Sequence, residues 1–449
     1  YDPSDNNFNC NGIISPDRVY NPHAYEIAYC HQNIWAEPVY LKAGKISVYN
    51  ENFFRNLDNY KLVWTVLKNG KAVQTGEVDK LNVEPQQRCE LTLPIKMDDL
   101  CPHAELMLNV DFVLKSAEPL LEAGTRVAYN QFEMQQGACF RKTPKAPEVN
   151  KDTKLVLKNK ASDTQIVVSN KRCTVAFNRS TGLLSTYNVD GKPLLGEGGT
   201  LKPNFWRAVT DNDMGAGVQK NNRIWREPKL KLVAINSVLD KKNNKADVHV
   251  DYDMPEVGAQ LTLTYNVMAD GSVRVTQQMT PKTGDKRPFL LRYGMVMQLP
   301  YDMQVSEFYG RGPIENYADR KLSQNVGIYK QTADEQFYPY IRPQETGTKS
   351  DIRWWKQTTD NGFGFKIVSP ELFSASALHY SIDDLDEGLD KAQRHSPQVP
   401  KSKYTELCID LGQTGVGGVN SWSSEAIALP PYRLPYKQYT FTFMLVPQK

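Results

Sequence analysis

Residues 61–75 read KLVWTVLKNGKAVQT, and this stretch decides the fold class of the chain. Leu62, Trp64 and Val66 would share one face of a strand, because side chains alternate between the two faces with a period of two. Asn69-Gly70 follows directly, and a second strand-like run begins at Lys71. Asn-Gly between two such runs predicts a β-hairpin with positive φ at both turn residues.

Turns of the same kind recur along the chain. They stand at Asp190-Gly191, Asp270-Gly271 and Asn361-Gly362. Four such turns with few helical patterns predict an all-β chain after residue 35.

The residues before this region have a different pattern. Asn21 and Pro22 suit the N-cap and the first position of a helix, so a helix is expected at 22–32. A short apolar strand is expected before it, at 11–14. One strand followed by one helix indicates a single α/β unit.

A charged, proline-rich stretch, RKTPKAPE at 141–148, separates two β regions. Its composition and lack of periodicity are typical of a linker. The region after it is too long for one immunoglobulin-like sandwich and has no repeat of fixed period, so we expect a large two-sheet sandwich. One helical interruption is expected near 384–394, where Leu385, Leu389 and Ala392 have helical spacing.

Composition excludes several classes of protein. The 449 residues carry 54 basic and 51 acidic side chains, which gives no electrostatic reason to expect binding to nucleic acid or to an anionic membrane. No window approaches 18 consecutive apolar residues, so no membrane span is expected. The seven cysteines form no CxxC pair, so neither a disulfide framework nor a zinc site is expected.

The start of the chain is polar and abrupt. It begins at Tyr1 with no Met and no basic-then-apolar leader, and residues 1–11 read YDPSDNNFNCN. We interpret this as the middle of a longer protein or as a product of processing.

The common catalytic motifs are missing from the sequence. There is no G-x-S-x-G elbow, P-loop, Rossmann fingerprint or H-E-x-x-H pair. A nucleophilic-serine enzyme and a metal hydrolase are therefore not indicated.

Two acidic clusters and two aromatic segments are candidate sites. Asp211-Asn212-Asp213 in TDNDMGAG fits either a polar surface turn or a mobile loop beside a ligand. Asp383, Asp384 and Asp386 fit a solvated helix start. Trp422 ends the glycine-rich GVGGVNSW at 415–422 and fits either a core position or a platform for a sugar ring. In Arg353-Trp354-Trp355 the two indoles should face opposite ways.

A third polar cluster, GRGPIENYADR at 310–320, packs Glu, Asp and Arg side chains around a turn. For this cluster we favour an ion-pair network that braces a loop over a catalytic role.

Taken together, GRGPIENYADR, TDNDMG, TGVGGVNSW and PQETGTKSDIRWW resemble the C-terminal region of the large β-galactosidases of glycoside hydrolase family 2. NFNCNGIISPDRVYNPHAYE at 7–26 resembles the end of the catalytic barrel of the same family. The resemblance implies a mainly β fold: a TIM-barrel remnant at 1–33, an immunoglobulin-like β-sandwich at 34–145, a linker at 146–164, and a galactose-mutarotase-like β super-sandwich at 165–449.

The resemblance also implies a mechanism. Such enzymes hydrolyse terminal β-D-galactosides such as lactose by a retaining mechanism with two carboxylates about 5 Å apart. Both are barrel glutamates upstream of the segment that resembles residues 1–32, and Asn50-Glu51 lies in the strand-rich region and is rejected as their counterpart. No catalytic residue and no magnesium ligand is therefore expected in this chain, and the chain alone is expected to be inactive.

Certain binding positions are carried over by the resemblance. Phe8, through its carbonyl, and Asn11, through its amide, match sodium ligands near the galactose, with the acidic ligand of that site in the absent barrel. Trp422 matches a tryptophan that stacks on the leaving group, and Asp211, Asn212 and Asp213 match a support loop at the site. Sodium and magnesium, a galactoside substrate, a homo-oligomer and a bacterial cytoplasm or periplasm are implied for the intact parent.

Two other readings stay open. One is a stand-alone carbohydrate-binding module, against which the α/β unit argues. The other is a mutarotase-like epimerase, which would need a paired acid and base. His249 and His379 are the histidines between residues 165 and 390, and neither lies in a recognisable motif.

Overall fold

A computed structural model describes residue 10 and residues 12–97, 103–137, 153–282, 284, 286–390 and 394–448. The chain divides into two compact units. The larger comprises residues 1–17, 143–321 and 329–449, and the smaller comprises residues 18–142 and 322–328.

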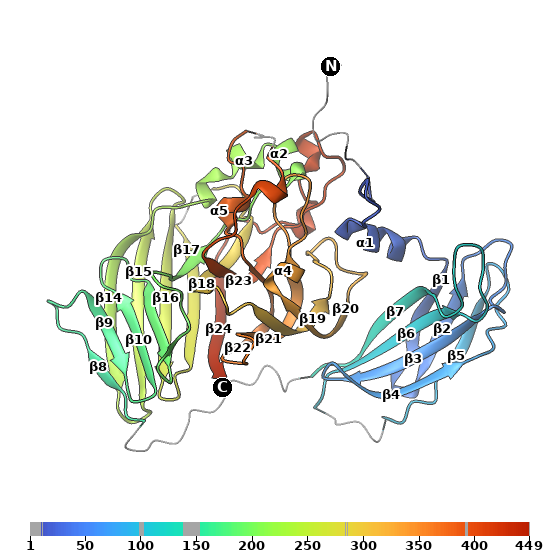
Figure 1. Cartoon of the computed structure of the whole chain (residues 1–449), viewed down its shortest axis with the longest axis horizontal. Coiled ribbons are helices and arrows are strands. Elements are labelled where there is room, and N and C mark those ends of the chain that lie inside the picture. Colours follow the sequence, from blue (N-terminus) through green and yellow to red (C-terminus); the bar gives the residue numbers. More distant parts are fainter. Residues whose placement is uncertain are drawn as a thin grey trace. The chain divides into compact units, whose positions relative to one another are not determined.

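The smaller unit contains one helix and two antiparallel sheets (Figure 1). Its elements are α1 (Pro22–Cys30), β1 (Ile34–Tyr40), η2 (Leu41–Ala43), β2 (Lys45–Asn50), β3 (Tyr60–Lys68), β4 (Lys71–Val78), β5 (Arg88–Thr92), β6 (Leu106–Leu114) and β7 (Arg126–Gln135). One sheet has the order β1-β2-β5 and the other β4-β3-β6-β7.

The alternation that predicted β3 also builds the core of this unit. Tyr60, Leu62, Trp64 and Val66 are buried, and the residues between them are partly exposed. The turn after β3 is the predicted one, since Asn69 has φ 50° and Gly70 has φ 82°. The predicted helix is also confirmed, with Asn21 at the N-cap and Pro22 at its first position. The strand expected at 11–14 is wrong for the described residues 12–14, where Ile14 forms only an isolated bridge.

The larger unit is built from one long antiparallel sheet, one strand of which, 325–332, begins within the segment 322–328 of the smaller unit. Its strands are β8 (Val156–Lys158), β9 (Gln165–Ser169), β10 (Cys173–Asn178), β11 (Leu184–Val189), β12 (Lys192–Pro193), β13 (Leu201–Asn204), β14 (Lys231–Asp240), β15 (Lys245–Met254), β16 (Ala259–Met268), β17 (Val273–Pro281), β18 (Arg292–Pro300), β19 (Val305–Gly312), β20 (Asn325–Thr332), β21 (Lys349–Thr358), β22 (Gly364–Leu378), β23 (Tyr404–Gln413) and β24 (Tyr439–Gln448). The short helices are α2 (Asp211–Gly215), α3 (Val218–Asn221), η4 (Arg223–Trp225), α4 (Ala333–Gln336), α5 (Ile382–Leu385), η5 (Ser396–Gln398), η6 (Ser424–Ala426) and η7 (Pro430–Tyr432).

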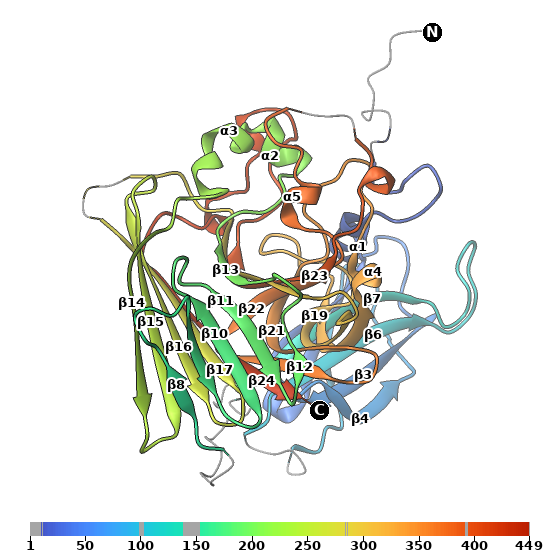
Figure 2. The ribbon, with the colours of Figure 1, turned by 60° about the vertical axis from the view of Figure 1, so that its left-hand side comes forward.

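This sheet curls until its ends meet. β24 pairs with β17 along one side and with β22 along the other. Figure 2 shows the long strands β14 to β17 as one curved wall of the unit. Along these strands buried residues alternate with more exposed ones, as expected for a sheet with one face in the core. On β16 the buried residues include Leu261, Leu263 and Tyr265. The expected mainly β architecture is therefore confirmed, and the region expected as a large two-sheet sandwich is built from one sheet that curls and closes on itself.

The hairpin turns of the larger unit are of two kinds. Asp190 and Gly191 both have positive φ, as predicted. At 270–271 and 361–362 the glycine alone has positive φ, so the prediction for both residues is wrong there. The reason is a longer loop, in which the glycine N–H closes a four-residue turn on Met268 or Thr359 and the glycine takes the left-handed position.

Two other expectations differ from the structure. The helix expected at 384–394 is wrong in position, since α5 covers Ile382–Leu385 and residues 391–393 lie outside the described residues. Ser381 caps α5 in a box with Asp384, and the chain becomes extended at Asp386. β8 lies inside the stretch 146–164 expected as a linker, because it hydrogen-bonds to β9.

A buried ionic cluster lies between β18 and β23. The Arg292 guanidinium is 2.8 Å from Glu345 Oε1 and 3.5 Å from Asp410 Oδ2, and the three side chains are almost fully buried. One cation therefore faces two carboxylates that have almost no solvent-accessible surface. Burial raises the pKa of Asp410 to about 7, which Arg292 opposes and Glu345 reinforces.

We expect Asp410→Asn to change the pH dependence of stability. Because the pKa of Asp410 is raised in the folded state, its contribution to stability is complete near pH 4 and is lost as the pH rises through about 7. The free energy of unfolding of the wild type should therefore fall relative to that of the variant over this range, measured by urea unfolding. Asp334→Asn, at an exposed ion pair with Lys401, is the control and should show no such drift. A constant difference between wild type and Asp410→Asn would contradict the assignment.

Two glycines on the same strand pair offer a matched test of packing. A Cβ on Gly294 of β18 would overlap the carbonyl of Ile409 and the side chain of Asp410, whereas one on Gly412 would meet Leu434 at 3.7 Å. Gly294→Ala should lower the free energy of unfolding by about 1–3 kcal/mol, because backbone must move. Gly412→Ala should change it by about 0.5 kcal/mol or less. If urea unfolding showed the same loss of free energy of unfolding for both variants, the predicted steric overlap at Gly294 would be contradicted.

Candidate functional site

Trp422 lies on a loop at 414–426 of the larger unit. Its side chain is 74% exposed, which excludes a core position in this structure. The loop turns sharply at Asn420, whose side-chain oxygen accepts hydrogen bonds from the backbone N–H of Trp422 at 3.1 Å and of Ser423 at 3.0 Å. A large aromatic side chain therefore stands on a turn that its own sequence stabilises.

Two charged side chains hold the base of this loop. The Asp319 carboxylate accepts hydrogen bonds from the backbone N–H of Val416 at 3.0 Å and of Gly417 at 2.8 Å. Arg207 donates to the carbonyl oxygens of Thr414 and Gly415. A Cβ at Gly415 would overlap the Asp319 carboxylate, so this position requires glycine. The glycines of GVGGVNSW thus allow a close approach of backbone to a carboxylate.

The predicted support residues form a helical turn. Thr210 caps α2, and its hydroxyl and the Asp213 carboxylate form a capping box, which is why this segment is a helix rather than a loop. Asp213 is 4% exposed and binds Arg207 through both oxygens, at 2.8 Å and 3.0 Å. Burial alone would lower the pKa of Arg207, but the carboxylates of Asp213, Glu345 and Asp319 together outweigh it, so that the pKa is raised. The ion pair therefore joins α2 to the base of the Trp422 loop.

The same helix also contacts the tip of the loop. Asn212 donates from its side-chain amide to the carbonyls of Asn420 at 3.1 Å and Ala426 at 3.3 Å. A Cβ at Gly215 would overlap the backbone of Ser421. Asp211 pairs with Arg342 at 2.6 Å. The structure thus brings 211–213 and the Trp422 loop together, while their contact with a substrate stays a prediction.

Arg207, Asp319 and Arg342 were not singled out from the sequence as parts of this site. Asp319 lies within GRGPIENYADR, where an ion-pair network was expected, and that network is present. Glu315 accepts hydrogen bonds from Arg320 at 2.5 Å, Thr346 at 2.9 Å and the backbone of Gly347 at 2.7 Å. Asp319 contacts residues 97 and 98 positions away, a separation that leaves no periodic signal in the sequence.

The adjacent tryptophans face opposite ways, as predicted. Trp355 is fully buried and stacks on Phe308 with ring centroids 4.9 Å apart. Trp354 is half-buried, with the Lys366 ammonium 4.6 Å from its ring centroid.

The epimerase alternative finds no support in the two histidines. His249 contacts Thr264 at 3.1 Å, and His379 stacks on Tyr301 at 3.9 Å and contacts Thr405 and Gln304. Within the described residues neither imidazole is hydrogen-bonded to a carboxylate, so the acid–base pair of that chemistry is not formed by them.

The described residues contain neither expected sodium ligand. Phe8 and Asn11, the expected sodium ligands, lie outside the described residues. Among the residues that the structure describes, no three His, Cys, Asp or Glu side chains are grouped so as to hold a metal ion. The described cysteines, at 10, 30, 89, 173 and 408, are free thiols. No described helix has the length and apolar character needed to span a bilayer.

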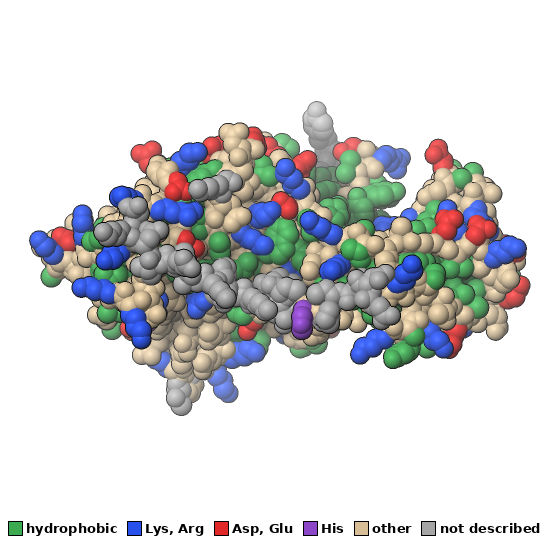
Figure 3. Space-filling view, turned by 90° about the horizontal axis from the view of Figure 1, so that it is seen from below, with side chains coloured by type: hydrophobic (Ala, Val, Ile, Leu, Met, Phe, Trp, Pro, Cys, Tyr) green, Lys and Arg blue, Asp and Glu red, His purple; other side chains and the backbone are tan. Residues whose placement is uncertain are grey.

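Basic and acidic side chains occur side by side on the surface. On the face drawn in Figure 3, basic and acidic side chains are interspersed. This agrees with the nearly balanced total of 54 basic and 51 acidic residues.

Comparison with known proteins places these features in a family. The family model for the β-galactosidase small chain matches residues 169–445, and that for domain 4 of β-galactosidase matches residues 46–135. A β-galactosidase of Priestia megaterium is 32% identical over 99% of this chain and 41% of its own length. One from Halalkalibacterium halodurans is 27% identical over 94% of this chain and 40% of its own length. The chain thus spans about two fifths of the length of these relatives.

A solved structure of galactose 1-epimerase from Lactobacillus acidophilus covers 65% of this chain and 97% of its own at 9% identity. Its TM-score of 0.33 is too low to support an argument about fold or chemistry. The family models carry the assignment, because that for the small chain alone covers more than half of the 449 residues. The chain belongs to the β-galactosidase family, as the part that contains domain 4 and the small-chain domain.

Proposed function

We propose that the chain is the C-terminal portion of a bacterial enzyme that hydrolyses terminal non-reducing β-D-galactosides such as lactose, with retention of configuration. Its own contribution is a sugar contact through Trp422 and the frame that holds this residue. The observation that carries the proposal is an exposed tryptophan on a braced loop, inside the region that matches the small-chain family model.

The loop suits the binding of a leaving-group sugar. An indole face is a flat apolar surface on which the C–H face of a pyranose can rest, and such burial is favourable. The loop is held at its base by Asp319 and Arg207 and at its tip by Asn212. Little conformational entropy is then lost when a sugar binds, because the platform is already ordered.

The reaction itself is assigned to the rest of the parent. A retaining glycosidase needs a nucleophile and an acid/base carboxylate about 5 Å apart. We propose that both are glutamates of a barrel outside this chain, that 1–33 is the end of that barrel, and that 34–145 and 165–449 are immunoglobulin-like and mutarotase-like domains. Sodium bound in part by Phe8 and Asn11, magnesium, and assembly with the remaining large-chain portion into a homo-oligomer belong to the same proposal.

The purified 449-residue chain should therefore release no galactose from lactose or o-nitrophenyl β-D-galactoside. Hydrolysis would be followed by absorbance and by galactose assay against a protein-free blank, with the intact parent as positive control. A rate above the blank that survives repeated purification would contradict the assignment of the carboxylates to the barrel.

In the intact parent, Trp422→Ala should weaken binding of glucose on the leaving-group side about two- to tenfold, because one stacking contact is lost. Galactose inhibition should change much less. Both are measured as inhibition constants, together with the rate of transfer to glucose as acceptor. Trp422→Phe keeps an aromatic face and should recover part of the loss. An unchanged acceptor preference in Trp422→Ala would remove Trp422 from the site.

A further inference from the structure

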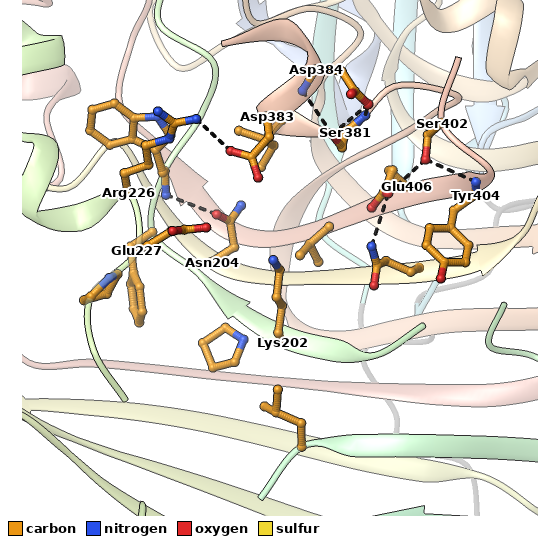
Figure 4. Close-up of a pocket in the computed structure, with 18 of the residues that line it drawn as sticks. Lys202, Asn204, Arg226, Glu227, Ser381, Asp383, Asp384, Ser402, Tyr404 and Glu406 are labelled. Atoms are coloured by element: carbon orange, nitrogen blue, oxygen red, sulfur yellow. Dashed lines mark hydrogen bonds and ion pairs between the residues drawn. The ribbon is translucent and has the colours of Figure 1, made fainter. Parts of the chain in front are cut away.

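A cavity of about 530 Å³ lies in the larger unit, and none of its lining residues belongs to the Trp422 loop (Figure 4). Its floor is one face of three neighbouring strands, β13, β18 and β23. Lys202 and Asn204 are two residues apart on β13 and so share this face, and Gln298 of β18 stands directly opposite Glu406 of β23. Figure 4 shows Lys202, Asn204 and Glu406 arranged around the same space.

The floor carries one buried polar group that the protein itself leaves without a hydrogen-bond partner, and a carboxylate and an ammonium beside it. Asn204 is 8% exposed, its oxygen accepts from Trp206 N at 3.2 Å, and its side-chain N–H₂ has no partner within the described residues. Glu406 is 6% exposed, and its hydrogen bonds, from Gln298 at 3.4 Å and Ser402 at 3.2 Å, both reach Oε1. Lys202 is exposed. Burial raises the pKa of Glu406 and the Lys202 ammonium opposes this rise, so the two charged groups face the same space. A buried donor without a partner is costly, which points to a ligand or water at this place.

The walls around this floor are fixed by contacts of their own. Arg226 pairs with Asp383 at 2.9 Å, and Asp384 caps α5 through Ser381. The indole of Trp206 donates to Asp386 at 2.6 Å, which sets its orientation. The cavity is thus preorganised, and its volume exceeds what one hexose ring needs.

The charges select the class of ligand. Four carboxylates line the cavity, those of Glu227, Asp383, Asp384 and Glu406, against the cations of Lys202, Arg226 and Lys403. A strongly anionic or cationic ligand would meet like charges on part of the wall. A neutral molecule with adjacent hydroxyl groups can accept from Asn204 and Lys202 and donate to Glu406 at the same time.

From this geometry we propose that the cavity is a second binding site, for a neutral monosaccharide or the end unit of an oligosaccharide, held by Asn204, Lys202 and Glu406 and separate from Trp422. The site needs no residue outside this chain. It does not depend on the proposed hydrolytic function, because no catalytic step is involved.

The test uses the full 449-residue chain with D-galactose and D-glucose as probes and glucose 6-phosphate as the anionic comparison. Saturation-transfer NMR and calorimetry should show saturable millimolar binding of a neutral sugar and weaker binding of the phosphate. Glu406→Gln and Lys202→Met keep the shape of each side chain and should each weaken binding about tenfold, because a charged hydrogen bond is lost.

Two further variants serve as controls. Glu307→Gln changes an ion pair with Lys356 that does not line the cavity, and Trp422→Ala removes the other candidate sugar contact. Glu307→Gln should bind both sugars within twofold of the wild type, and Trp422→Ala should keep saturable binding of D-galactose. Loss of binding in Trp422→Ala alone would overturn the cavity site and leave the proposed function intact. Three other results would also overturn the cavity site. These are an absence of saturable sugar binding, tighter binding of glucose 6-phosphate than of a neutral sugar, and unchanged affinity in folded Glu406→Gln and Lys202→Met.

Discussion

The candidate site depends on one buried guanidinium. Arg207 has no exposed side-chain surface, and it binds both oxygens of Asp213 and the carbonyls of Thr414 and Gly415. A charge without water must be matched on every side, since an unpaired buried ion costs several kcal/mol. This requirement ties three segments together: the strand-to-helix segment 204–211, the helix α2 and the loop after β23. The loop that carries Trp422 is thus held in place because its carbonyl groups complete the hydrogen bonds of Arg207.

A similar rule operates elsewhere in the larger unit. Arg292 is matched by Glu345 and Asp410, and Glu315 by Arg320 and several neutral donors. Apart from Arg320, which lies five residues from Glu315, these partners come from loops or strands distant in sequence. The unit therefore uses buried polar clusters to hold its loops, while the curled sheet supplies the apolar core. The side-chain amide of Asn204 is buried without a hydrogen-bond partner, as are Arg292 Nε and both oxygens of Asp410 in the ionic cluster, but Asn204 lines a cavity that can admit a ligand.

Local patterns predicted the elements well where the deciding contacts are local. The Asn-Gly turn at 69–70 and the helix that begins at Pro22 follow from backbone preferences of a few residues. The helix expected at 384–394 failed because helical spacing of Leu385, Leu389 and Ala392 does not fix where a helix starts, and the capping box of Ser381 and Asp384 begins the short helix α5 earlier. The turns at 270–271 and 361–362 differ because loop length, rather than the dipeptide, decides which residue takes positive φ.

The sequence by itself determined a mainly β chain and, through its motifs, the family and the choice of Trp422 and 211–213 as candidate site residues. It could not decide between a core and a surface position for Trp422, since an indole beside glycines suits both. Nor could it show that Asp319 holds a loop 97 residues away, or that Lys202, Asn204 and Glu406 share one face of a sheet. These facts depend on which strands become neighbours. That pairing is set by closure of the whole sheet and by the matching of buried charges, and neither leaves a periodic trace in the sequence.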